Sequence, residues 1–251
     1  MYLSLIFFLI LIIPFIVMSK PIAAGSVPPY RIVLGSVLMT AVVAVIIFMA
    51  AALTGDGLYA QIQDAIKAMA KVLANDPNVT EMLHLADVSE SERVTFFTSV
   101  YSEALQLLPA CIFVTSAVVS YIVYCLLSRS LSKRLPQVKR MPKFREFSLP
   151  QGAISGLFLM YLVSWLLTLS GVFENEMLYK NVNYIFDFAF SLQGVSVVLM
   201  LSHMKRVPKA IGVIVAAVLW VTTIGRSLLV ILGMIDLIMG LKMRIQSNPR
   251  R

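Results

Sequence analysis

Charged residues are scarce in this 251-residue chain, which argues against a soluble globular protein. Only 14% of its residues are Asp, Glu, Lys or Arg, whereas soluble domains carry about 25%. Hydrophobic residues make up 59% of the sequence, and the mean hydropathy is +0.86. This composition is typical of an integral membrane protein.

Cysteine and histidine are scarce as well, with two of each. Cys111 and Cys125 lie on one predicted helix about 21 Å apart by helical rise, so they cannot form a disulfide with each other. His84 and His203 belong to no metal-binding pattern. The sequence contains no phosphate loop, dinucleotide fingerprint or HExxH motif. We therefore expect no enzymatic activity, no metal and no cofactor.

Long apolar runs are the main feature that the chain does have. Five of them cover residues 32–54, 105–127, 152–170, 184–202 and 210–232. A helix rises about 1.5 Å per residue, so each run is long enough to cross the roughly 30 Å hydrocarbon core of a bilayer. Residues 1–18 are also apolar, and no basic n-region precedes Leu3, so they indicate a retained first span, or the remnant of one, rather than a cleaved signal peptide. We predict an all-α transmembrane bundle of six membrane segments, forming a single membrane domain over residues 1–251.

Charge is distributed unevenly between the runs, and this predicts the orientation of the chain. Residues 129–145 carry seven basic side chains, whereas residues 56–103 carry eight acidic and three basic ones. Positive charge stays on the cytoplasmic side, so the basic link is predicted inside and the acidic segment outside. The same rule accounts for the net charge of +8 without a nucleic-acid partner. The lipid bilayer is the partner that it predicts.

The outer segment, residues 55–103, is predicted to be helical and amphipathic. An apolar stripe at helical spacing contains Ile62, Ile66, Met69 and Leu73. Ser89 with Glu92 forms a capping box that opens a further helix. The stripe fits helices that lie on the bilayer surface and equally helices that cap the bundle.

The last apolar stretch extends to residue 241, which is about 48 Å as one straight helix. A single span would place the basic C-terminal tail outside, against the charge rule. We favour a break near Gly225–Arg226, which would return the tail to the cytoplasm and give seven segments if both halves count. One long helix is the alternative.

Ionisable residues inside apolar runs are costly, so they are the first positions to consider for function. Asp187 is the strongest of them, and it shares a predicted helical face with Asn183. Gln193 adds a polar group nearby, Arg226 interrupts the last run, and Tyr161 offers an aromatic surface. We predict these five residues as ligand-binding candidates. A structural pairing of Asp187 with Arg226 is the alternative.

Small residues predict where helices pack closely. Gly152 and Gly156 form a GxxxG pattern in one run, and Ser116 and Ser120 form a similar pair in another. Asp236 follows the last run and precedes basic residues, so we expect it near the inner boundary in a structural pairing.

Four short segments carry a resemblance to a known family. They are Leu107–Leu108–Pro109–Ala110, Phe147–Ser148–Leu149–Pro150, Gln193–Gly194, and Gly233–Met234–Ile235–Asp236 followed by Lys242 and Arg244. Through them, residues 32–244 resemble the YybS-like family of bacterial multi-pass membrane proteins of unknown function. Members of that family carry further hydrophobic segments ahead of this region, which implies a shortened N-terminal part here.

That family is distantly similar to the S components of energy-coupling-factor transporters, which bind a micronutrient and pass it to a shared ATPase module. The resemblance implies a small-solute binding or transport subunit of the bacterial cytoplasmic membrane, with a solute and an ATPase module as partners. No binding residue is transferred by it. A structural or regulatory membrane protein that acts through protein contacts, without a ligand, is the alternative function. A polar-lined cavity of roughly 300 Å³ or more would favour the first function.

Overall fold

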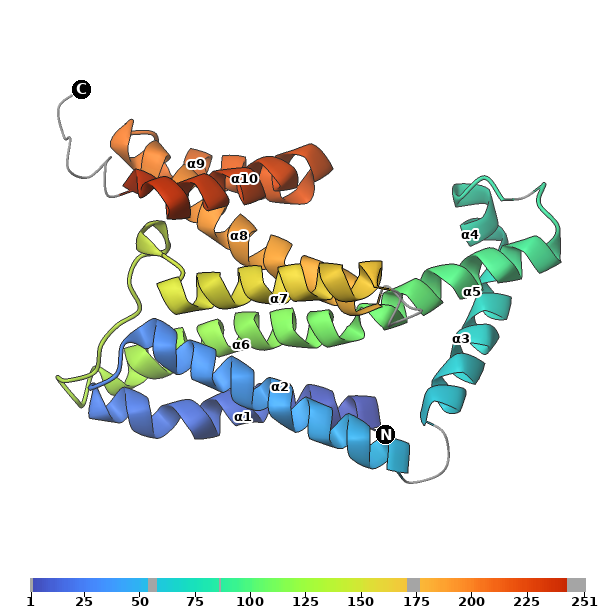
Figure 1. Ribbon diagram of the computed structural model, residues 1–251, viewed down its shortest axis with the longest axis horizontal. Coiled ribbons are helices and arrows are strands. Elements are labelled where there is room, and N and C mark those ends of the chain that lie inside the picture. The colour runs from blue at the N-terminus through green and yellow to red at the C-terminus, as the bar shows by residue number, and fades with distance from the viewer. Residues whose placement is uncertain (1, 54–57, 86, 171–176, 243–251) are drawn as a thin grey trace. The chain divides into compact units, whose positions relative to one another are not determined.

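The computed structural model describes residues 2–53, 58–85, 87–170 and 177–242 (Figure 1). Those residues form ten α-helices and one short 3-10 helix, and they contain no strand. The all-α prediction is therefore confirmed. The chain divides into two compact units, Met1–Lys139 and Arg140–Arg251.

The first unit begins with α1 (Tyr2–Ala24) and α2 (Pro29–Leu53), and its last helix is α6 (Leu108–Leu131). These three helices pack against one another. Ile10, Ala44 and Ile112, one from each helix, form a buried apolar cluster. Ser36 on α2 and Ser120 on α6 are fully buried, and their hydroxyl oxygens lie 3.1 Å apart. Small side chains thus let α2 and α6 approach closely.

Three helices follow α2 in the sequence and precede α6: α3 (Leu58–Ala74), α4 (Pro77–Met82) and α5 (Glu90–Gln106). We call them the α3–α5 layer. Ser89 caps α5 through the predicted capping box, in which its hydroxyl accepts from the Glu92 N–H. The layer has a small core of its own around Ala70, Ala74 and Phe97. α5 ends at Gln106 and α6 begins at Leu108, so Leu107 separates the two helices.

The second unit contains η1 (Phe144–Glu146), α7 (Gln151–Leu169), α8 (Met177–Met204), α9 (Lys209–Val221) and α10 (Thr223–Met239). α8 is its central helix, because η1, α7, α9 and α10 all pack against it. Aromatic rings join α7 to α8, with Phe158 edge-on to Phe186 at 5.3 Å between centroids.

The last apolar stretch is broken, as favoured from its charges. α9 and α10 are bent by 108° relative to each other. The break lies at Thr222, which ends α9 and precedes α10, three residues before the predicted position at Gly225. Arg226 accordingly lies in the first turn of α10 and not at the tip of the bend.

Three helices among the described residues are long and apolar enough to cross a membrane, namely α2, α6 and α8. The bent pair α9 and α10 makes a fourth candidate if it is counted as one span. α1 and α7 contain shorter apolar stretches, Phe8–Ala24 and Ile154–Leu169. The predicted count of six or seven segments is therefore not confirmed.

Candidate functional site

The site begins with the unusually close approach of α8 and α10. A Cβ atom at Gly194 would overlap the carbonyl group of Leu229, and one at Gly233 would overlap the carbonyl oxygen of Phe190. The absence of side chains at these two glycines lets the two backbones touch. Polar side chains next to the contact can then reach across it.

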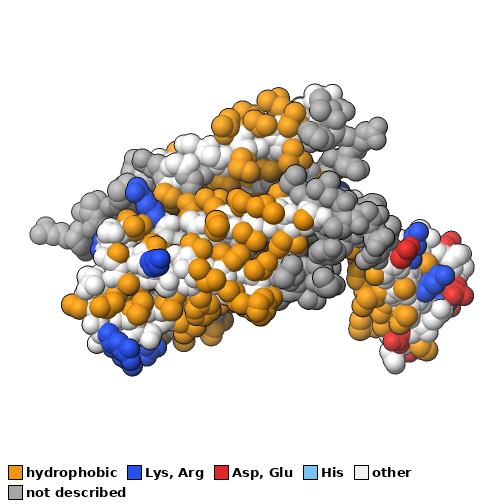
Figure 2. Space-filling model, turned by 90° about the horizontal axis from the view of Figure 1, so that it is seen from below, with side chains coloured by type: hydrophobic (Ala, Val, Ile, Leu, Met, Phe, Trp, Pro, Cys, Tyr) orange, Lys and Arg blue, Asp and Glu red, His pale blue; other side chains and the backbone are white. Residues whose placement is uncertain are grey.

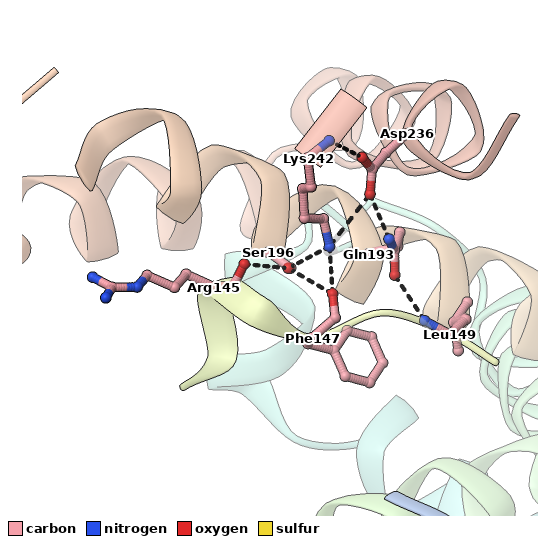
Figure 3. A network of polar contacts seen from close by, with 7 residues as sticks. All are labelled: Arg145, Phe147, Leu149, Gln193, Ser196, Asp236 and Lys242. Carbon is pink, nitrogen blue, oxygen red and sulfur yellow. Dashed lines mark hydrogen bonds and ion pairs between the residues drawn. The ribbon is translucent and has the colours of Figure 1, made fainter. Parts of the chain in front are cut away.

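Asp236, on α10, is the centre of a buried polar network (Figure 3). Its carboxylate accepts a hydrogen bond from the Nε2 of Gln193 on α8, and from the backbone N–H of Lys242 at 2.9 Å. The Nζ of Lys242 lies 3.3 Å from the same carboxylate. The Oε1 of Gln193 accepts from the backbone N–H of Leu149 at 3.1 Å, so one amide joins α10 to the segment before α7.

Ser196 extends the network on the neighbouring turn of α8 (Figure 3). Its hydroxyl lies 2.9 Å from the carbonyl oxygen of Phe147 and accepts from the Lys242 ammonium group at 2.8 Å. The ammonium group also donates to the Phe147 carbonyl oxygen. All three ammonium protons thus have acceptors. We call Gln193, Ser196, Asp236 and Lys242 the Asp236 network.

The chemistry of the partners sets the orientation of the Gln193 amide. The Leu149 N–H is only a donor and the Asp236 carboxylate is only an acceptor, so Oε1 must face the first and Nε2 the second. Gln193 and Ser196 are fully buried and Asp236 is 5% exposed. Burial lowers the pKa of Lys242, whereas the neighbouring Asp236 carboxylate acts in the opposite direction. The ion pair is therefore both buried and satisfied by hydrogen bonds.

The predicted candidates Asp187 and Arg226 lie in a second cluster. The Arg226 guanidinium carbon lies 5.3 Å from the centre of the Tyr184 ring, one turn from Asp187 on α8. Arg226 is close enough to act electrostatically on the Asp187 carboxylate, but no ion pair joins them among the described residues. The Arg226 Nε is buried and has no hydrogen-bond partner among the described residues.

Tyr161 of α7 packs on a different face of α8 from the one that carries Tyr184. Its hydroxyl lies 3.1 Å from that of Tyr179 on α8, and its ring packs on Phe186 at 5.0 Å between centroids. Asn183 is half-buried on α8. We call Tyr184, Asp187 and Arg226 the Arg226 cluster.

The sequence placed Gln193 near Asp187, whereas the structure assigns it to the Asp236 network. Six residues on a helix turn through about 600°, which places the two side chains on different faces of α8. The structural pairing expected of Asp236 is present, but the sequence did not identify Gln193 as its partner or Ser196 as a partner of Lys242. The i, i+3 spacing of Gln193 and Ser196 is the signal that could have found them.

The helix contact expected at Gly152 and Gly156 is not found within the second unit. A Cβ atom at either glycine would have no atom within 4 Å, and Gly152 is exposed. The close contacts instead occur at Gly194 and Gly233, which the GxxxG pattern does not include. Ser116 and Ser120 on α6 are both fully buried.

The described residues contain no group of three or more His, Cys, Asp or Glu side chains that could hold a metal ion. A cavity of about 470 Å³ lies between α3 and α5, lined in part by Lys67, Lys71 and Thr98. It belongs to the first unit, whereas the five ligand-binding candidates all lie in the second.

Apolar helices of spanning length, with ionisable side chains held in buried polar clusters, define an all-helical membrane protein. The chain belongs to the family described as predicted membrane protein (DUF2232), which matches residues 1–237. It is 27% identical over 134 residues to the uncharacterized protein YybS of Bacillus subtilis (strain 168). That match covers 52% of this chain and 42% of YybS, and no solved structure matches the chain.

The resemblance to a YybS-like family is thereby confirmed. Three of the four sequence segments behind this resemblance meet in the Asp236 network. The first contributes Phe147 and Leu149, the second Gln193, and the third Asp236. They lie far apart in sequence and close together in the fold.

Proposed function

We propose that this protein is a small-solute binding or transport subunit of the bacterial cytoplasmic membrane, and that the Arg226 cluster holds the solute. The resemblance to S components of energy-coupling-factor transporters adds an ATPase module as the energy-coupling partner. Both proposals go beyond the family, whose function is unknown.

The observation that carries the proposal is the buried and unpaired Nε of Arg226. A buried donor without a partner costs about 1–3 kcal/mol, and more when it is charged. The neighbouring Asp187 carboxylate also accepts no hydrogen bond from the described residues. A small solute that carries a carboxylate or a similar acceptor would pair with the guanidinium group, for which planar, two-point contacts are favourable. A donor on the solute would pair with Asp187.

We further propose six membrane segments: α1, α2, α6, α7 and α8 cross the membrane, and the bent pair of α9 with α10 forms a hairpin that enters and leaves it on the same side. In this topology the basic link at 129–145 is cytoplasmic and the α3–α5 layer lies on the opposite side. The contact of Lys242 with the Phe147 carbonyl oxygen supports it, because the chain after α10 then returns to the side of the basic link. Both basic segments satisfy the positive-inside rule in this arrangement.

Native mass spectrometry of the full chain, purified from its own membrane, tests the proposal. We expect a small-molecule adduct on the wild-type protein and its loss in Arg226→Gln and Asp187→Asn, with the melting temperature retained. Lys209→Gln, at an exposed position, is the control and should keep the adduct. Co-purified ATPase subunits would support the energy-coupling partner. A wild-type protein without an adduct, and without a retained solute after incubation with candidate carboxylates, contradicts the proposal.

The Asp236 network favours a second candidate function. Its hydrogen bonds are satisfied within the protein, so it needs no ligand and is suited to a structural or regulatory membrane protein that acts through protein contacts. In that case Arg226→Gln would change stability alone. A second change, Asp187→Asn, would then partly restore it, because no uncompensated charge of the pair would remain.

A further inference from the structure

We infer that one edge of the α3–α5 layer, formed by Met69, Val72 and Val100, lies in the lipid interface of the bilayer. We call these three residues the apolar edge. The apolar edge contacts the membrane surface at the end of the first unit where α2 ends and α6 begins. The inference is independent of any solute site in the second unit.

The apolar stripe predicted from the sequence is only partly used within the layer. Leu73 packs against the core around Phe97, and Ile66 is buried. Met69 and Val72 remain 55% and 69% exposed on α3, and Val100 is 47% exposed on α5. The apolar surface of α3 is therefore wider than the small core of the layer can cover.

The opposite edge of the layer carries charged and hydroxyl-bearing side chains beside the apolar Val94. Lys67 and Lys71 of α3 lie there with Thr95 and Ser99 of α5, around the 470 Å³ cavity. Figure 2 shows hydrophobic side chains along one edge of this part of the molecule and acidic and basic ones along the other. One apolar and one charged edge are the distribution expected of helices that lie in a membrane interface.

The connections of the layer keep the apolar edge close to the membrane surface. Val100 precedes Leu108, the first residue of α6, by eight residues, or about 12 Å of helix. α3 begins five residues after Leu53, so the link to α2 spans at most about 18 Å. α3 also runs across the direction of α2 and α6 (Figure 1), as a helix lying in the membrane plane does.

The lipid surface fits this edge better than a protein partner does because the edge has no polar group of its own to set an orientation. The exposed surfaces of α2 and α6 are apolar as well, because Leu38, Val42 and Ile122 are each more than half exposed. The apolar edge extends that surface beyond the ends of the two helices.

Fluorescent labelling of the full chain in lipid vesicles tests the inference. Single cysteines are introduced at Val72 and Val100 after Cys111 and Cys125 are replaced by Ser, and each is labelled with an environment-sensitive dye. Their sequence neighbours provide matched controls, as Lys71→Cys and Ser99→Cys. We expect blue-shifted emission and quenching by nitroxide-labelled phosphatidylcholine at Val72 and Val100, and water-like, unquenched emission at both controls.

Equal quenching at all four positions would overturn the inference, as would water-like emission at Val72 and Val100. Blue-shifted emission without lipid quenching would also overturn it, because a protein would then cover the edge. Photolabelling of the wild-type chain with a diazirine phospholipid provides a measurement without substitutions. Adducts should map to Met69, Val72 and Val100, and adducts at Thr95 or Ser99 alone would contradict the inference.

Discussion

The Lys242 ammonium nitrogen lies 3.3 Å from the Asp236 carboxylate, and a left-handed glycine between them makes the contact possible. Gly240 ends α10 with φ at 60°, and its N–H donates to the Asp236 carbonyl oxygen. The chain turns there sharply enough for the backbone and the side chain of Lys242 to meet the same carboxylate. Glycine adopts this conformation without the steric cost that other residues incur.

Removing the cation should be strongly destabilising. Lys242→Met leaves the Asp236 carboxylate buried without its counter-charge, a change that costs about 3–5 kcal/mol in buried pairs. The double variant Lys242→Met, Asp236→Asn should recover part of this loss, because no isolated charge remains. Thermal unfolding in detergent measures both, with Lys209→Met as the control at an exposed lysine. Equal unfolding temperatures for Lys242→Met and the control would contradict the role given to the network.

Four glycines allow a matched comparison of helix contacts. In a helix, Gly→Ala normally stabilises by about 1 kcal/mol. At Gly152 and Gly156, where a Cβ atom meets open space, we expect that gain or no change. At Gly194 and Gly233 the new methyl group would meet the backbone of the facing helix, so we expect a loss of about 1–3 kcal/mol.

The same unfolding measurement distinguishes the two pairs of glycines. Destabilisation at Gly152 and Gly156, with Gly194→Ala and Gly233→Ala tolerated, would reverse the assignment of the close contact. It would also restore the GxxxG interpretation made from sequence.

The helices of the fold were largely predictable, and the reason is physical. A run of about twenty apolar residues must satisfy its backbone hydrogen bonds internally in lipid, which leaves the helix as the solution. The capping box at Ser89 was equally visible because it depends on neighbours in sequence. The bend at Thr222 was inferred from charge, but its position was wrong by three residues, since Gly225 can continue a helix.

The candidate site was less predictable because it depends on which helix faces which. Nothing local distinguishes Gly194 and Gly233, which contact the neighbouring helix, from Gly152 and Gly156, which do not. Lys242 appeared to be one of several basic tail residues that set the topology. Its contact with Asp236 follows from the turn at Gly240, and its contact with Ser196 follows from the packing of α10 on α8.

Ser120 should tolerate loss of its hydroxyl but not an increase in size. Its hydrogen bond to Ser36 lies between helices, where such bonds contribute about 0.6 kcal/mol on average, so Ser120→Ala should have a small effect. Ser120→Leu adds bulk at a fully buried contact between α2 and α6 and should lower the unfolding temperature clearly. Val118→Leu is the control, because Val118 is 46% exposed on the same helix. Equal effects of the two leucine substitutions would show that α2 and α6 do not pack through Ser120.

The orientation of the chain follows from its charges and can be tested with two cysteines. Residues 129–145 carry seven bases and residues 56–103 carry eight acids against three bases, so the first region should be cytoplasmic and the second external. Ser132 lies just after α6, and Asn78 is exposed on α4, so a single cysteine at each reports on one side. Cys111 and Cys125 are replaced by Ser in both variants. A membrane-impermeant maleimide applied to intact cells should label Asn78→Cys at once and Ser132→Cys only after the membrane is opened. The reverse pattern would invert the topology, and it would also place Lys242 and its contact with Phe147 on the outer side.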